Sequence, residues 1–121
     1  MNEFVLAASV GITGGCGAAL RYLVDQSLTE ILGARFPWGT MIVNLTGSLA
    51  LGLLAGVVSG GPWFTILAMG LLGGYTTFST ANLEMLRLVR EKRYAASLLH
   101  GPGMLLGCTA LAVVGILITS G

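Results

Sequence analysis

Long apolar runs separated by short polar or glycine-rich segments dominate the hydrophobic pattern of this chain. No formal charge occurs from residue 36 to 83 or from residue 94 to 121. A helix needs about 20 predominantly apolar residues to cross a bilayer. The pattern therefore predicts four membrane-spanning helices, at roughly residues 4–24, 39–58, 63–86 and 95–119.

The ends of these spans carry the expected boundary signals. Ser59-Gly60-Gly61-Pro62 is a turn signal that divides the first long uncharged run into two spans. Trp38, Trp63 and Tyr94 fall at span ends, where amphipathic rings favour the membrane interface.

Small residues recur four positions apart within three of the spans. The sets are Gly11, Gly15 and Ala19; Ser48, Gly52 and Gly56; and Gly103 and Gly107. This spacing puts the members of a set on one helix face, where they let helix backbones approach closely in lipid. We expect a compact helical bundle.

Composition supports one all-α membrane domain over residues 1–121. Hydrophobic residues make up 55% and charged residues 9% of the chain, against about 25% charged in soluble domains. The net charge of +1 gives no reason to expect a nucleic acid partner. Cys16 and Cys108 match no metal signature. With no catalytic cluster either, the chain is not expected to be an enzyme.

Polar groups inside the apolar spans are the candidates for function. They are Arg21, Asn44, Thr46, Ser48, Thr76, Thr77, Ser79, Thr80, Asn82 and Glu84. No Asp or Glu lies centrally in any span, which favours passive permeation over proton-coupled export. Two alternatives stay open. One is a small multidrug-resistance-type proton-coupled exporter, which needs a carboxylate in its first span. The other is a non-conducting assembly subunit.

Two of these polar positions, and His100 in the fourth span, have two interpretations each. The Asn44 amide can donate to an anion or make an interhelical hydrogen bond. Arg21 can extend to the interface, the commoner case, or attract anions into a vestibule. His100 precedes Gly101-Pro102, a pair that predicts either a kink or a ragged start of the helix. A lone histidine there is more often structural than a proton relay.

The segment 73–80 is the strongest local signal, since it combines two glycines with four hydroxyl residues at mid-span. Such residues weaken a helix. Composition alone slightly favours an unbroken helix whose hydroxyls bond back to its own carbonyls. The alternative is a broken helix with free carbonyls that bind a cation.

Three motifs, each in a different span, identify a family resemblance. They are Gly14-Gly15-Cys16-Gly17-Ala18 through Arg21-Tyr22; Gly39-Thr40-Met41-Ile42-Val43-Asn44 with Gly47; and Gly73-Gly74-Tyr75-Thr76-Thr77-Phe78-Ser79-Thr80 with Glu84. In these, the chain resembles the Fluc/CrcB family of fluoride ion channels over essentially its whole length.

The resemblance implies a passive, fluoride-specific channel in the cell membrane that exports cytoplasmic fluoride and so reduces its toxicity. It implies a dimer of two antiparallel four-helix subunits, with the third helix broken at mid-span. The fluoride pathway would involve Asn44, Phe78, Ser79, Thr80, Glu84 and Arg21. A structural sodium ion at the dimer interface would bind the backbone carbonyls of Gly73 and Thr76.

Two features of the sequence indicate which kind of subunit would complete the dimer: a difference from the family pattern at Ala81 and the distribution of basic residues. The family usually has a second phenylalanine where this chain has Ala81. All six basic residues lie near the first and third connections: Arg21, Arg35, Arg87, Arg90, Lys92 and Arg93. The positive-inside rule places both connections in the cytoplasm and both termini outside. Such a fixed orientation predicts a heterodimer with a homologous subunit of opposite orientation.

Overall fold

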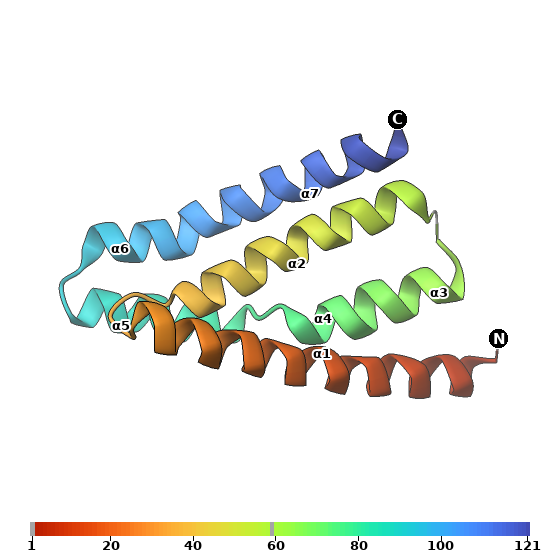
Figure 1. The fold of residues 1–121 in the computed structure, drawn as a ribbon, viewed down its shortest axis with the longest axis horizontal. Helices are drawn as coiled ribbons and strands as arrows, with labels where there is room; N and C mark the ends of the chain where they lie inside the picture. Colours follow the sequence, from red (N-terminus) through yellow and green to blue (C-terminus); the bar gives the residue numbers. More distant parts are fainter. Residues whose placement is uncertain (1, 59) are drawn as a thin grey trace.

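The computed structural model describes residues 2–58 and 60–121, which form helices and no strand (Figure 1). The first two spans are α1, Glu3–Leu32, and α2, Trp38–Val57. The third runs through α3, Gly61–Thr65, the π-helical η1, Ile66–Leu72, and α4, Gly73–Tyr75, and resumes as α5, Ser79–Arg90. The fourth consists of α6, Tyr94–Leu98, the π-helical η2, Leu99–Gly103, and α7, Met104–Ser120.

The prediction of apolar helices suited to spanning a membrane is confirmed. In the part of the chain that the structure describes, three continuous helical stretches are long and apolar enough: Glu3–Leu32, Trp38–Val57 and Tyr94–Ser120. The remaining stretch, 61–90, is divided by its interruption. α1 extends past the predicted end at residue 24, because a helix can continue into water after its apolar run has ended.

The turn between the second and third spans lies where the sequence predicts it. Ser59 is outside the described residues, but Gly60 and Gly61 have positive φ angles of 83° and 88°. This left-handed conformation favours glycine over residues with a side chain.

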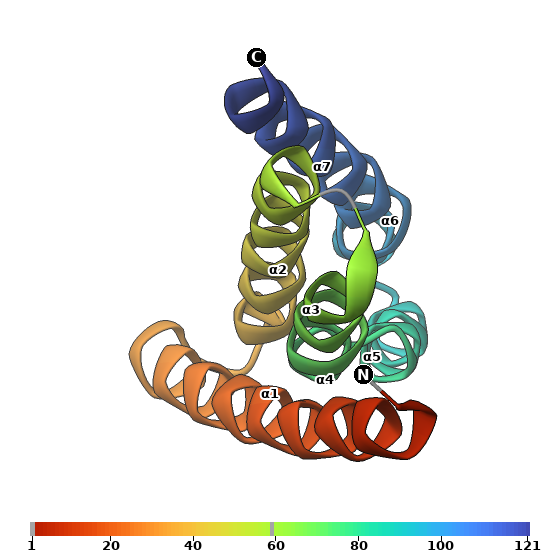
Figure 2. The ribbon, with the colours of Figure 1, turned by 90° about the vertical axis from the view of Figure 1, so that its right-hand side faces the viewer.

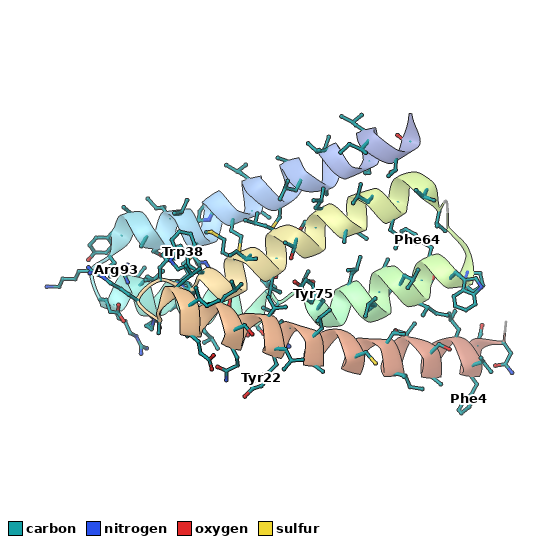
Figure 3. All side chains as sticks on the ribbon, in the orientation of Figure 1. Phe4, Tyr22, Trp38, Phe64, Tyr75 and Arg93 are labelled. Carbon is teal, nitrogen blue, oxygen red and sulfur yellow. The ribbon has the colours of Figure 1, made fainter. Side chains whose placement is uncertain are left out.

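The four spans lie side by side, with both termini at one end of the bundle (Figure 1). α2 packs chiefly on α7, and α1 packs on η1 and α4. Seen from the end, α1 crosses beneath the other spans (Figure 2). The α1–α2 and α5–α6 connections share the end opposite the termini, where Figure 3 shows Arg93 far from Phe4.

Small residues bring two helix pairs into backbone contact. A Cβ atom at Gly52 would collide with the backbone of Ala112, so the predicted packing face of the second span is confirmed. In α1 the close contacts come instead from Gly14 and Gly17, which meet Gly74 and Leu71. The predicted face with Gly11 and Gly15 is exposed, because those positions point away from η1 and α4.

The predicted kink at Gly101-Pro102 appears as the wider π-helical turn η2. Proline has no backbone N–H to donate, and helices kink both at prolines and at π-bulges. The turn includes His100, which is fully buried.

Candidate functional site

The third span is interrupted between α4 and α5. Thr76 has φ −81° and ψ 159°, an extended conformation that ends α4. The slight preference for an unbroken helix was therefore wrong. The Thr76 hydroxyl does bond back to the Leu72 carbonyl, at 3.0 Å, as the unbroken helix would require. Hydrogen bonds from residues of other helices stabilise the interrupted conformation instead.

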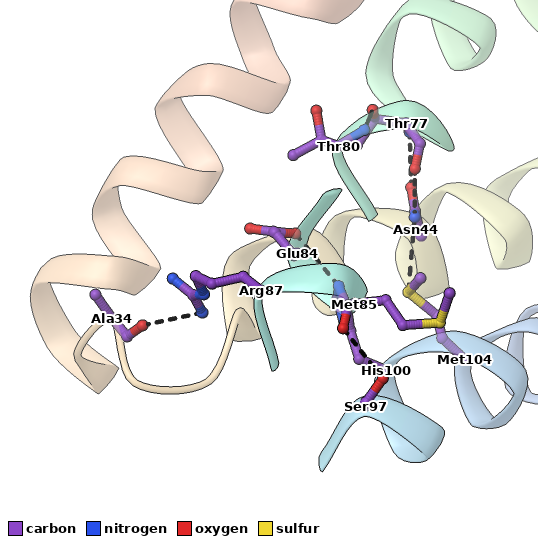
Figure 4. A network of polar contacts seen from close by, with 10 residues as sticks. All are labelled: Ala34, Asn44, Thr77, Thr80, Glu84, Met85, Arg87, Ser97, His100 and Met104. Atoms are coloured by element: carbon purple, nitrogen blue, oxygen red, sulfur yellow. Dashed lines mark hydrogen bonds and ion pairs between the residues drawn. The ribbon is translucent and has the colours of Figure 1, made fainter. Parts of the chain in front are cut away.

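The Asn44 side chain replaces the helical partners that Thr77 lacks (Figure 4). Asn44 Nδ2 donates to the Thr77 carbonyl and Thr77 N–H donates to Asn44 Oδ1, both at 2.8 Å. Asn44 Nδ2 also lies 3.6 Å from Met104 Sδ. Of the two readings of Asn44, the structure contains the interhelical bond. Unpaired peptide groups in an apolar environment are costly, so this clamp stabilises the break.

Two more groups fix the ends of the break. The Thr77 hydroxyl accepts from Thr80 N–H at 3.3 Å and so caps the start of α5. Arg21 Nε on α1 donates to the Gly74 carbonyl, with 3.4 Å between the atoms. Arg21 thus reaches the break from the neighbouring helix, a contact that neither of its two predicted readings includes.

Two carbonyl oxygens at the break remain uncommitted. Thr77 N–H bonds to Asn44 and Thr80 N–H to the Thr77 hydroxyl, so the regular helical donors to Gly73 and Thr76 are used elsewhere. Within residues 2–58 and 60–121, no hydrogen bond reaches these two carbonyls. Free carbonyl oxygens of this kind suit a hard cation.

An apolar groove of about 530 Å³ opens beside the break. It is lined by residues of α2, the break, α5, η2 and α7, among them Asn44, Phe78, Ala81 and His100. Phe78 is 79% exposed. Ala81, where the family resemblance implies a second phenylalanine, borders this groove and is also buried in the core cluster with Met41 and Met104.

The other predicted site residues lie along α5. Ser79 is exposed and Thr80 is half-buried, directly after the break. Glu84 follows one turn after Thr80, and its Oε1 lies 3.2 Å from His100 Nε2. The structure thus gathers Asn44, Phe78 and Ser79 at the break and puts Glu84 beside a fourth-span histidine.

Sequence reasoning missed two side-chain contacts. Glu84 and His100 are the same number of residues before and after Lys92, which lies in the α5–α6 connection. Antiparallel packing of the two helices could therefore have predicted the contact between Glu84 and His100. The hydroxyls of Thr46 and Tyr75, 3.0 Å apart, form a further bond between α2 and α4. No periodicity in the sequence indicates that second pair.

Comparison with known proteins matches this chain to one family of membrane proteins. The family model described as CrcB-like protein, Camphor Resistance (CrcB), matches residues 8–116. A relative from Leifsonia xyli subsp. xyli, named fluoride-specific ion channel FluC 1, is 41% identical over 96% of this chain and 87% of its own length. Fluoride-specific ion channels FluC from Photobacterium profundum and Methylobacterium nodulans are 34% and 43% identical, over 99% and 88% of this chain and 91% and 86% of their own lengths.

Proposed function

This chain belongs to the CrcB family and is a fluoride-specific ion channel of the membrane rather than an enzyme, and we propose that it conducts fluoride passively. Its conduction would let fluoride leave the cytoplasm through the plasma membrane and so reduce fluoride toxicity. The observation that carries the proposal is the interrupted third span beside an apolar groove, with the Asn44 amide of α2 and the hydroxyl and aromatic side chains of the third span gathered there.

A small anion needs donors to replace its water, since an isolated charge in a low-dielectric medium costs tens of kcal/mol by Born estimates. Hydroxyl and amide hydrogens are such donors, and aromatic ring edges carry partial positive charge. We assign the fluoride pathway to Asn44, Phe78, Ser79, Thr80, Glu84 and Arg21. Asn44 would act there by holding Thr77, and by donating to fluoride if its amide exchanges partners.

We further propose that a sodium ion is bound by the Gly73 and Thr76 carbonyls at a dimer interface. The uncommitted state of these oxygens fits such an ion. One chain supplies only this pair, so a second subunit is needed to complete the coordination. A cation there supplies a fixed positive charge that offsets the cost of a nearby anion.

The same reasoning favours an antiparallel dimer with a homologous subunit of opposite orientation. Phe78 and the groove beside it present apolar surface that a second subunit would cover. Arg35, Arg87, Arg90, Lys92 and Arg93 lie in or beside the two connections at the end away from the termini, whereas Arg21 lies within α1 and contacts Gly74. The five residues at the connections support an orientation with both termini outside. Labelling a terminal cysteine from each side tests this, and equal labelling from both sides would contradict a fixed orientation.

Efflux from liposomes tests passive conduction. Vesicles are loaded with potassium fluoride and contain this chain alone or together with a homologous subunit. We expect efflux that requires valinomycin, because fluoride alone carries charge outward, and no dependence on a pH gradient. Efflux driven by a proton gradient would favour the exporter alternative, and no efflux in any assembled dimer would favour the assembly subunit.

A single substitution tests the role of Asn44 in the pathway. Asn44→Asp keeps an acceptor for Thr77 N–H but places a carboxylate beside the path, where it repels an anion. We expect greatly reduced fluoride flux per assembled dimer. Normal flux would exclude Asn44 from the pathway.

A further inference from the structure

The buried His100 and the half-buried Glu84 form a pair beyond the break (Figure 4). His100 is 0% exposed, and its Nε2 lies 3.2 Å from Glu84 Oε1, whose side chain is 24% exposed. The Phe36 ring meets the imidazole edge-on, with ring centroids 5.6 Å apart. The imidazole is therefore held between α5 and the residues that precede α2.

The second ring nitrogen of His100 makes this pair a proton-binding site. When Nε2–H donates to the Glu84 carboxylate, Nδ1 is the ring atom left to accept a proton. Nδ1 is buried and has no hydrogen-bond partner in the described part of the chain. Neutral imidazole offers a lone pair there, which repels an anion. Protonated imidazole offers an N–H donor and a charge that cancels the carboxylate.

The pair lies next to the proposed fluoride route. His100 lines the same groove as Asn44 and Phe78. Glu84 is one turn beyond Thr80 on α5. The net charge of the Glu84–His100 pair therefore attracts or repels a fluoride ion on either side of the break.

Several ionisable groups lie on the elements packed around His100. Within residues 2–58 and 60–121, Glu84 is the ionisable group in hydrogen-bond contact with His100. Asp25 interacts electrostatically with Glu84 and with Arg21 on α1. The elements packed around η2 also carry Arg35, Arg87, Arg90, Glu91, Lys92, Arg93, Tyr94 and Cys108. Histidine is the side chain whose ordinary charge change falls between about pH 5 and 8, and the chain has 1 histidine.

We propose that His100 is a proton-binding residue of the fluoride pathway, which neutralises Glu84 when protonated and leaves it as a repelling charge when deprotonated. This inference rests on the proposed channel function. A proton from water binds Nδ1, while Nε2–H keeps its bond to Glu84. The Glu84–His100 pair then changes from a net charge of −1 to zero. Fluoride flux should accordingly fall as pH rises through the histidine range.

The test is the pH profile of valinomycin-dependent fluoride efflux, with equal pH on both sides and the leak of protein-free vesicles subtracted. Between about pH 6 and pH 8 we expect the flux of the unaltered channel to fall roughly tenfold. His100→Gln can still donate to Glu84 but does not titrate, so its profile should be flat. His100→Asn serves the same purpose if the Gln variant does not assemble.

Ser97→Ala is the matched structural control. The Ser97 hydroxyl donates to the Met85 carbonyl at 3.1 Å and links the same two helices, α6 and α5, without a titratable group. This variant should keep the falling profile. A flat profile in the unaltered channel, or an unchanged slope in His100→Gln, would overturn the proposal. Absence of efflux at every pH would contradict the channel function itself.

Discussion

The α2–α7 pair and the interrupted third span use opposite means to hold helices together. α2 and α7 are continuous through their contact, where Gly52 and Gly115 let the two backbones touch. The third span is held by polar groups instead: the Asn44 amide, the Thr77 hydroxyl and the Arg21 guanidinium. In lipid, close backbone contact holds two continuous helices together. Polar side chains from neighbouring helices instead stabilise an interruption, because they bond to peptide groups that the helix leaves unpaired.

Removal of the Asn44 clamp should have the largest effect on stability. Asn44→Ala leaves the N–H and the carbonyl of Thr77 without their side-chain partner. Each unsatisfied group costs about 1–3 kcal/mol, so the free energy of unfolding should fall by roughly 2–6 kcal/mol. Equilibrium unfolding in detergent measures it. Ser48→Ala, one turn later on α2, is the control and should change stability little. An equal loss in both variants would show that the clamp does not stabilise the break.

Disruption of the backbone contact in the α2–α7 pair should come next. A side chain at Gly52 collides with the Ala112 backbone, and overpacking of this kind costs about 1–3 kcal/mol. We expect Gly52→Val to lower the unfolding free energy by that amount. Gly11→Val is the matched control, because nothing lies within 4 Å of a Cβ at Gly11. If Gly11→Val is as harmful, helix propensity rather than close packing sets the cost.

Loss of the α5 cap should have a smaller effect. Thr77→Val removes the acceptor of Thr80 N–H, and such caps contribute about 0.5–2 kcal/mol. Thr109→Val is the control, since the Thr109 hydroxyl only bonds back to the Leu105 carbonyl within α7. Thermal unfolding of both variants in the same detergent distinguishes them. Similar midpoints would mean that the cap contributes nothing to α5.

The exposed ion pair at the basic end of the bundle should have the smallest effect. Arg87 Nε and Glu91 Oε2 lie 3.7 Å apart with both side chains more than 40% exposed. Exposed pairs contribute about 0–1 kcal/mol. Glu91 Oε1 also lies 3.7 Å from Arg93 Nη1, so Glu91→Gln removes both pairs. It should still lower the unfolding free energy by only about 1 kcal/mol or less, and by still less at high salt. A loss comparable to that of Asn44→Ala would mean that the connections, rather than the break, stabilise the bundle.

The same contrast explains what the sequence could predict. Apolar runs and glycine spacing depend on local pattern, so the four spans and the contact through Gly52 could be read directly. The break depends on a bond between residues 44 and 77, on different spans. Composition of residues 73–80 alone could not predict that bond, and it slightly favoured a continuous helix. The family resemblance provided the interruption, because it carries information about tertiary contacts.

Two features of the site were predicted neither by the sequence pattern nor by the family resemblance. Ala81 was read as a missing pathway residue, and the structure adds that it is packed in the core with Met41 and Met104. His100 was given a structural role as the commoner case, yet it contacts Glu84. Both features depend on how α5 packs against its neighbours, which the local sequence pattern does not determine.

Fluoride flux through Phe78→Ala, compared with Phe4→Ala, most directly tests whether fluoride passes beside the break. Each phenylalanine is 79% exposed, but Phe78 adjoins the break, whereas Phe4 lies near the N-terminus of α1 (Figure 3). We predict that Phe78→Ala lowers fluoride efflux per assembled dimer at least about tenfold, or about 1.4 kcal/mol in barrier, while Phe4→Ala stays near the unaltered rate. Equal efflux from the two variants would contradict a pathway at the interrupted span.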